Sequence, residues 1–142
     1  MTILCEIVSQ DRLVFTGEAD IVVIPGMEGQ MGILPRHTPV LTALNFGVIT
    51  VRLRDRDEHF TVAGGVAEVL PEKVTILADA AENVEEIDIE RAMNARERAE
   101  ERLKLMTTAD ADRYLRVASA LRRSNLRLQA AQKYRKSTKT RI

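Results

Sequence analysis

The first half of the chain alternates between short apolar runs and turn residues. Residues 3–8, 48–53 and 74–77 are rich in β-branched and apolar side chains, and within 48–53 apolar and polar positions partly alternate, as on a strand with one face in water. Turn sequences such as Gly64-Gly65 separate the runs. The pattern predicts roughly eight or more strands without intervening helices, which favours an antiparallel β-sandwich or barrel.

The last third of the chain has the periodicity of α-helices. Over residues 89–106 the apolar positions recur three and four residues apart and form one stripe, made of Ala92, Ala95, Ala99, Leu103 and Met106. Asp88 is placed to cap this helix at its N-terminus. A hydroxyl within residues 107–110 offers a cap for a second helix over about 109–133, whose narrow apolar side includes Leu115, Ala118, Leu121 and Leu128. The small side chains predict a weakly held antiparallel hairpin.

Glycine, proline and charge divide the chain at nearly the same place. All seven Gly and all four Pro lie before residue 72. Residues 1–86 carry six Lys or Arg against fourteen Asp or Glu, whereas residues 87–142 carry fifteen against seven. Beyond Asp112 there are ten basic residues and no acidic one. We therefore expect an α+β fold with two domains, a sandwich over 1–86 and a helical hairpin over 87–142, and different partners for each.

The sequence offers little support for an enzyme or a metalloprotein. No P-loop is present, and Gly26, Gly29 and Gly32 are spaced as loop residues, not as a dinucleotide-binding fingerprint. The two His are 22 residues apart in sequence, and Cys5 has no second cysteine. Because Cys5 lies in an alternating apolar segment, we expect it to be a small buried apolar residue. We expect no catalytic residues and no metal site. Because the sequence has no signal peptide or membrane-spanning segment, a cytoplasmic protein is expected.

The basic end of the chain keeps nucleic-acid binding open as an alternative. Ten positive charges after Asp112 would attract any polyanion. In that region only Tyr114 and Tyr134 could stack on bases, and no known nucleic-acid module is present. We expect the basic residues to form a solvated face or to meet acidic protein surface, and we expect no nucleic-acid partner.

Three segments closely resemble the ε subunits of bacterial F-type ATP synthases. They are the loop at residues 26–41, the paired strands at residues 64–69 and 74–79, and the helix start Ile87-Asp88-Ile89-Glu90-Arg91-Ala92. The resemblance spans essentially the whole chain. It implies a sandwich of about ten strands followed by a helical hairpin, in a non-catalytic subunit.

The resemblance also implies partners. In the family the sandwich lies at the foot of the central stalk, against the γ subunit and above the membrane-embedded c-ring. Glu28, Gln30 and Met31 would then face the c-ring, and His37 would lie near the rotor contacts. The subunit couples proton flow to ATP synthesis, and its extended hairpin inhibits ATP hydrolysis by contacting the α and β subunits of the catalytic head. The expected place is the cytoplasmic face of the cell membrane, as a peripheral part of the complex.

No cofactor is required, but ATP is implied as a regulatory ligand of the hairpin. The family motif for this site matches Ile87, Asp88, Arg91 and Ala92, and matching the remainder adds four residues, namely Glu82, Arg98, Arg123 and Arg127. Arginines from both helices would neutralise the phosphates, and carboxylates and backbone oxygens at the helix start would accept from the adenine amino group. Asp88 can equally be a plain helix cap paired with Arg91. A free-standing ATP sensor is the alternative function.

Overall fold

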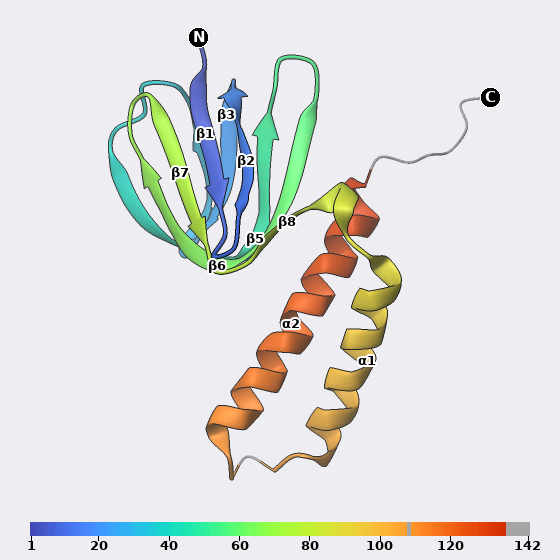
Figure 1. Cartoon of the computed structure of the whole chain (residues 1–142). Helices are drawn as coiled ribbons and strands as arrows, with labels where there is room; N and C mark the ends of the chain where they lie inside the picture. The colour runs from blue at the N-terminus through green and yellow to red at the C-terminus, as the bar shows by residue number, and fades with distance from the viewer. Residues whose placement is uncertain (108, 136–142) are drawn as a thin grey trace, which may run out of the picture. The chain divides into compact units, whose positions relative to one another are not determined.

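The chain forms two compact units that follow each other in sequence (Figure 1). The computed structural model describes residues 1–107 and 109–135. The first unit is Met1–Asn83 and the second begins at Val84. The predicted boundary lies after residue 86. The short 3-10 helix η1, Val84–Glu86, belongs to the helical unit because Arg135 donates hydrogen bonds to its backbone oxygens.

The first unit is a sandwich built from one continuous sheet, as the family resemblance implies. In the described residues it has eight strands, and their bounds are β1 Ile3–Val8, β2 Leu13–Ala19, β3 Ile21–Gly26, β4 Gly29–Ile33, β5 Val40–Arg52, β6 Asp57–Val69, β7 Lys73–Ala78 and β8 Ala81–Asn83. The order across the sheet is β2-β1-β7-β6-β5-β3-β4, and β8 pairs with β6. All pairs are antiparallel except β1 with β7, which is parallel.

The strand count is eight and not about ten because two strands are unusually long. β5 and β6 each contain 13 residues and absorb runs that the sequence pattern separates. β6 pairs with β8 through residues 60–62 and with β7 through residues 65–69. Gly64 and Gly65, with φ of 86° and 132°, lie between these two halves. The left-handed backbone conformation of these two glycines allows β6 to pair with β8 before them and with β7 after them.

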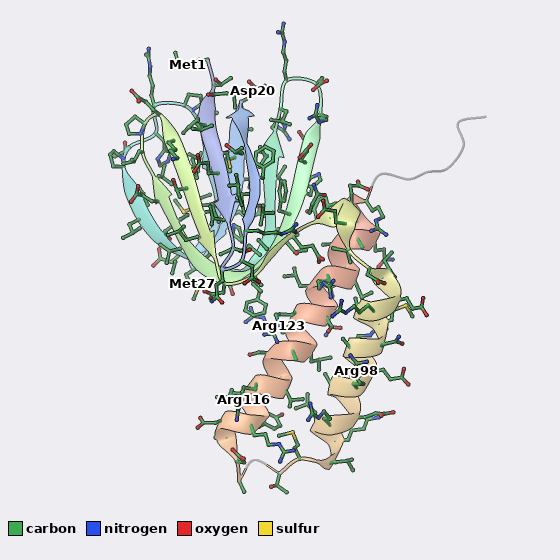
Figure 2. The ribbon with its side chains drawn as sticks, in the orientation of Figure 1. Met1, Asp20, Met27, Arg98, Arg116 and Arg123 are labelled. Atoms are coloured by element: carbon green, nitrogen blue, oxygen red, sulfur yellow. The ribbon has the colours of Figure 1, made fainter. Side chains whose placement is uncertain are left out.

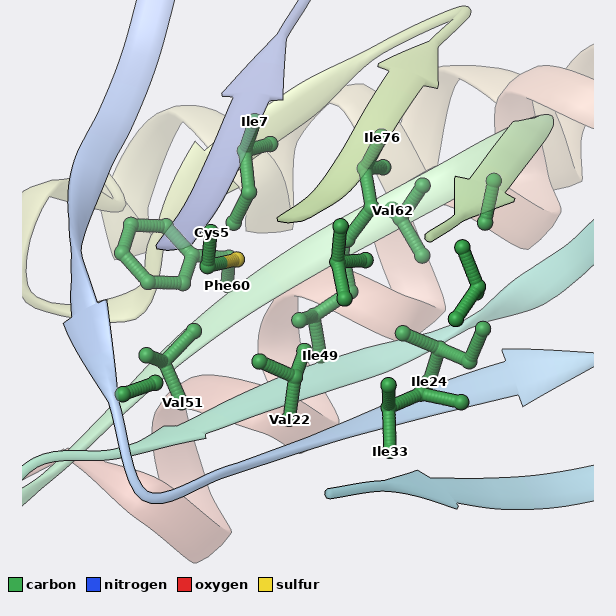
Figure 3. Packing of buried hydrophobic residues seen from close by; sticks show 14 of the residues in the cluster. Cys5, Ile7, Val22, Ile24, Ile33, Ile49, Val51, Phe60, Val62 and Ile76 are labelled. Atoms are coloured by element: carbon green, nitrogen blue, oxygen red, sulfur yellow. The ribbon is translucent and has the colours of Figure 1, made fainter. Parts of the chain in front are cut away.

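The core of the sandwich follows directly from alternation. In β1 every second residue is buried, at Ile3, Cys5 and Ile7. Figure 3 shows Cys5 and Ile7 packed with Val22, Ile49 and others, and Ile3 belongs to the same core cluster. The Phe60 ring lies 5.2 Å from that of Phe15 between centroids. The predicted burial of Cys5 as a small apolar residue is confirmed, at 0% exposure.

The second unit is the predicted hairpin of two helices, α1 Ile89–Leu105 and α2 Ala111–Tyr134. Asp88 caps α1, because its Oδ1 accepts from the Arg91 amide at 3.0 Å. The cap of α2 is the Asp110 carboxylate, which accepts from the Arg113 amide at 3.2 Å. The predicted hydroxyl cap is therefore wrong. A carboxylate at this position satisfies the same amide and also favours the positive end of the helix dipole.

The stripes that join the helices consist of small residues. On α1 the predicted stripe is confirmed, with Ala92 and Ala99 buried. On α2 the stripe contains Val117, Ser124 and Ala131, and Ser124 Oγ donates to the Ala120 oxygen within its own helix at 3.0 Å. The predicted place of Leu115 in the stripe is wrong. It lies about 200° around the helix from Val117 and is 61% exposed.

Candidate functional site

The start of α1 holds four of the residues predicted to bind ATP. Ile87 is 3% exposed and Ala92 is fully buried in the stripe, so both side chains serve packing. Asp88 and Arg91 are exposed, but Asp88 Oδ1 already accepts the Arg91 amide. The alternative use of Asp88 as a helix cap is thus present in the structure.

The predicted arginines share one feature of helical geometry. Arg91 and Arg98 directly precede the buried Ala92 and Ala99, and Arg123 directly precedes the buried Ser124. Each arginine therefore lies about 100° around the helix axis from the stripe, on the side of the residue that precedes it. When two right-handed helices face each other and run antiparallel, the residues that precede the two stripes lie on the same side of the helix pair. Figure 2 labels Arg98 on α1 and Arg123 on α2.

The same rule brings further arginines to this flank. Arg127, the fourth arginine of the predicted ATP site, directly precedes Leu128. Two arginines that sequence matching missed, Arg102 and Arg116, directly precede Leu103 and Val117. We call these six, Arg91, Arg98, Arg102, Arg116, Arg123 and Arg127, the arginine flank. Within the described part of the chain, no ion pair involves the other five, Arg91, Arg98, Arg102, Arg116 and Arg123. The signal that could have found the two missed residues is their position immediately before a stripe residue.

Glu82 is not part of this unit. It lies in β8 of the sandwich and pairs with Thr61, whose hydroxyl donates to the Glu82 oxygen at 3.4 Å. The other seven predicted ATP residues lie in the helical unit. The helical unit thus contains the predicted arginines and the predicted residues of the helix start.

A residue that sequence reasoning missed lies at the same helix start. Arg135, the C-cap of α2, donates from Nη2 to the backbone oxygens of Ile87 at 2.6 Å, Glu85 at 3.1 Å and Val84 at 3.4 Å. Of these, the Ile87 oxygen belongs to the helix start whose acceptors were predicted to bind an adenine amino group. No spacing rule points to Arg135, because its partners are 48 to 51 residues away in sequence.

The four residues predicted to bind partner subunits lie in two places. Glu28, Gln30 and Met31 lie together where β3 turns into β4, with Gln30 paired to Pro25 and Met31 paired to Ile24. Glu28 and Gln30 are exposed, whereas Met31 packs partly against the core. His37 lies beyond the other end of β4, where its Nδ1 is 2.7 Å from the Thr38 oxygen. The structure does not bring His37 into the turn.

The outer face of the sandwich carries an apolar row that the sequence analysis did not single out. Cross-strand pairing places Leu13, Val8, Leu77, Val66 and Ala43 side by side across β2, β1, β7, β6 and β5. Leu13 and Leu77 are each 56% exposed and Val66 is 39% exposed. We call this set the apolar row. A contiguous apolar strip on an outer sheet face is typical of a protein interface.

The next row on the same face is polar. Glu6, Thr75 and Glu68 are cross-strand partners two positions along β1, β7 and β6. Glu6 pairs with Lys73 at 3.2 Å between its Oε2 and Nζ. The apolar row is thus bordered by acidic side chains. Only the pairing register shows this, because no short sequence window contains the row.

Within residues 1–107 and 109–135, no group of three or more His, Cys, Asp or Glu side chains could hold a metal ion. No helix in these same ranges is long and apolar enough to cross a membrane. Burial raises the pKa of the Cys5 thiol from 9.0 to about 12, with a smaller contribution from the neighbouring Glu6 carboxylate.

Comparison with known proteins gives one consistent result. Residues 2–84 match the family model for the β-sandwich domain of the ATP synthase delta/epsilon chain, and residues 85–132 match its long α-helix domain. The ATP synthase epsilon chain of Dehalococcoides mccartyi is 42% identical over 137 residues, covering 92% of this chain and 93% of that protein. The one from Moorella thermoacetica is 46% identical over 127 residues, covering 89% and 93%.

A solved structure agrees with these sequence matches. A chain in the mitochondrial ATP synthase of Euglena gracilis superposes with a TM-score of 0.75 at 25% identity, and the match covers 92% of this chain and 81% of that one. The two family models together cover both structural units. The sandwich, the hairpin and the relatives therefore agree that this chain belongs to the family of ATP synthase epsilon chains, subunits of the F-type ATP synthase.

Proposed function

We propose that the chain is a non-catalytic subunit of the central stalk, which couples proton flow to ATP synthesis and restrains ATP hydrolysis through its hairpin. The observation that carries this proposal is the apolar row on the outside of the sandwich. A stalk subunit must hold a partner through a rotating cycle, and an exposed strip across five strands offers the area for such contact.

The sandwich supplies two surfaces for two partners. The apolar row, bordered by Glu6 and Glu68, fits the γ subunit, because a buried apolar centre with a polar rim is the usual anatomy of a stable interface. The turn with Glu28 and Gln30 fits the c-ring, since it presents exposed polar side chains at one end of β3 and β4. The Euglena gracilis structure contains an F1 part and a c-ring, which is consistent with both partners. The subunit would lie peripherally on the cytoplasmic face of the membrane.

The hairpin supplies the regulation. Its arginine flank would bind ATP phosphates when the two helices are packed together, and acidic surface of the α and β subunits when the hairpin extends. The support is the gathering of arginines from both helices on one side, five of them without an ion pair in the described chain. ATP is then a regulatory ligand and not a required cofactor. A free-standing ATP sensor would use the same flank but would have no need of the apolar row.

Co-assembly with γ tests this proposal. The full chain should co-purify with γ when the two are expressed together, and Leu77→Glu should reduce recovery at least tenfold by placing a charge in the apolar row. Thr75→Glu is the matched control, because it adds the same charge on the same face and strand but in the polar row. If the wild-type chain does not bind γ, the stalk role is wrong. Equal recovery of the two variants would remove the apolar row as the γ surface.

A further inference from the structure

A single guanidinium group joins the two ends of the helical unit. Nη2 of Arg135, just after α2, lies 2.6 Å from the Ile87 oxygen and 3.1 Å from the Glu85 oxygen. The Val84 oxygen is farther, at 3.4 Å. The two shorter contacts use both protons of a terminal NH2 group. Arg135, which follows the last helix, therefore binds the segment that begins the helical unit.

The start of the helical unit needs such a donor. Residues 84–87 form one 3-10 turn, closed by a long Ile87 amide to Val84 oxygen bond of 3.4 Å, before Asp88 begins the cap of α1. Val84 and Ile87 are 1% and 3% exposed, so their backbone is largely removed from water. Carbonyl groups in this position require hydrogen-bond donors from the protein. Arg135 supplies a charged one, which makes stronger bonds than a neutral donor.

The contact lies at the open end of the hairpin. At the opposite end the chain itself connects α1 to α2 through residues 106–110. Between the ends the helices meet through small stripe residues, such as Ala99 and Ser124, which bury little apolar area. Arg135 is thus a charged polar link between the far end of α2 and the segment that starts the unit.

We propose that Arg135 is a clasp that keeps the hairpin closed and whose release permits the helices to separate. A guanidinium group stays protonated at every physiological pH, so the clasp responds to competing contacts and not to protonation. Lysine is a poor replacement, because one ammonium group lacks the planar donor set that spans two carbonyl oxygens. The clasp concerns the hairpin alone, while its effect on hydrolysis rests on the proposed function.

Distance measurement between the helices tests the clasp on the full chain. Spin labels attached at Asn94→Cys on α1 and Gln129→Cys on α2, both exposed positions, report whether the helices are together, and buried Cys5 should remain unlabelled. Arg135→Gln should raise the widely separated population roughly tenfold, as expected for loss of charge-assisted hydrogen bonds. Arg135→Lys should give an intermediate value. Arg113→Gln, which removes a charge from exposed surface of α2 outside the arginine flank and away from the carbonyl groups, should match the parent protein.

Two results would overturn the clasp. One is an unchanged distance distribution in Arg135→Gln, with circular dichroism showing the helices intact. The other is an equal opening in Arg113→Gln, which would show that the loss of one positive charge, and not the loss of the Arg135 hydrogen bonds, separates the helices. In the assembled enzyme Arg135→Gln should inhibit ATP hydrolysis more strongly than the parent chain. If the helices separate but hydrolysis is unchanged, the clasp stands and the proposed braking role fails.

Discussion

Arginine side chains are arranged in the hairpin by one simple rule, in which each member of the arginine flank directly precedes a stripe residue. At the residue scale this spacing matters more than total charge. Arg96, in contrast, lies on the other flank and pairs with Glu100 at 3.9 Å, an exposed i,i+4 pair. The two kinds of arginine can therefore be separated experimentally within the same helix.

Substitutions on the two flanks should have different effects on ATP binding. Arg98→Ala and Arg123→Ala should each weaken binding by about 1.5–3 kcal/mol, because each removes a charge-assisted contact to phosphate. Arg96→Ala is the control and should bind as the unmodified chain does. Calorimetric titration of the full chain with ATP measures this. Absence of binding heat at millimolar ATP, or equal affinity in all three variants, would exclude the nucleotide site.

Because Cys5 is buried, we expect the stability of the sandwich to depend on pH in the alkaline range. Its thiol is buried, and the pKa is raised from 9.0 to about 12. Between these values the unfolded chain has lost the thiol proton while the folded chain keeps it. The stability provided by burying the neutral thiol is therefore complete below pH 9 and falls as pH rises toward 12, by about 1.4 kcal/mol per pH unit.

The comparison with Cys5→Ala isolates this effect. Urea unfolding at pH 8 and pH 10 should show a larger loss of unfolding free energy in the unmodified chain than in Cys5→Ala, by about 1 kcal/mol. Other groups titrate in this range, but they are common to both proteins. Identical pH dependence in the two proteins would mean that the thiol ionises as easily in the folded state as in the unfolded one.

At the element scale, β6 depends on glycine at position 65. Gly65 has a φ of 132°, and a Cβ placed there would collide with the Leu77 oxygen and lie 2.8 Å from the Ala78 Cα. These are backbone atoms of the neighbouring strand β7, which cannot move aside cheaply. The close approach at Gly65 holds β6 against β7 at the place where its pairing partner changes from β8.

Gly65→Ala should accordingly lower the unfolding free energy of the sandwich by more than about 3 kcal/mol, from backbone strain and collision together. Gly29→Ala is the matched control. Gly29 has a nearly equal φ of 131°, but nothing lies within 4 Å of an added Cβ. Its cost should be limited to about 1 kcal/mol from strain alone. Thermal and urea unfolding of both variants measure the difference, and similar losses would show that the collision at β7 is relieved.

At the scale of the whole molecule, the acidic sandwich and the basic hairpin are separate compact units. This division should allow the two proposed roles to be separated. Ending the chain after Asn83, where the structural boundary lies, should leave binding to γ intact and raise ATP hydrolysis of the assembled enzyme several-fold. High salt should mimic part of this rise with the full chain, because contacts made by exposed arginines are screened.

The hydrolysis assay has a direct control. An enzyme that carries the full chain, with all six arginines of the arginine flank changed to glutamine, should behave like the truncated form if the charge of the hairpin inhibits hydrolysis. Hydrolysis that is the same with and without the hairpin, over a range of ATP concentrations, would contradict the inhibitory role. The family assignment would be unaffected, since it rests on both domains of the sequence.

The sequence by itself determined the features that depend on local pattern. Alternation in residues 3–8 predicted β1 and the burial of Cys5, and the spacing from Ala92 to Met106 predicted the buried side of α1. Asp88 was predicted as a cap and is one. Side-chain direction in a regular element follows from its period, so these features need no knowledge of the remaining chain.

Tertiary structure decided what depends on pairing between distant segments. The parallel pairing of β1 with β7, the union of several runs into β5 and β6, and the apolar row all follow from register, which alternation leaves open. The stripe on α2 centres on Val117 and not Leu115, because contact with α1 and not hydrophobicity alone selects the buried face. The clasp at Arg135 required closure over some 50 residues. Such contacts depend on how segments meet in space, and local sequence does not encode that.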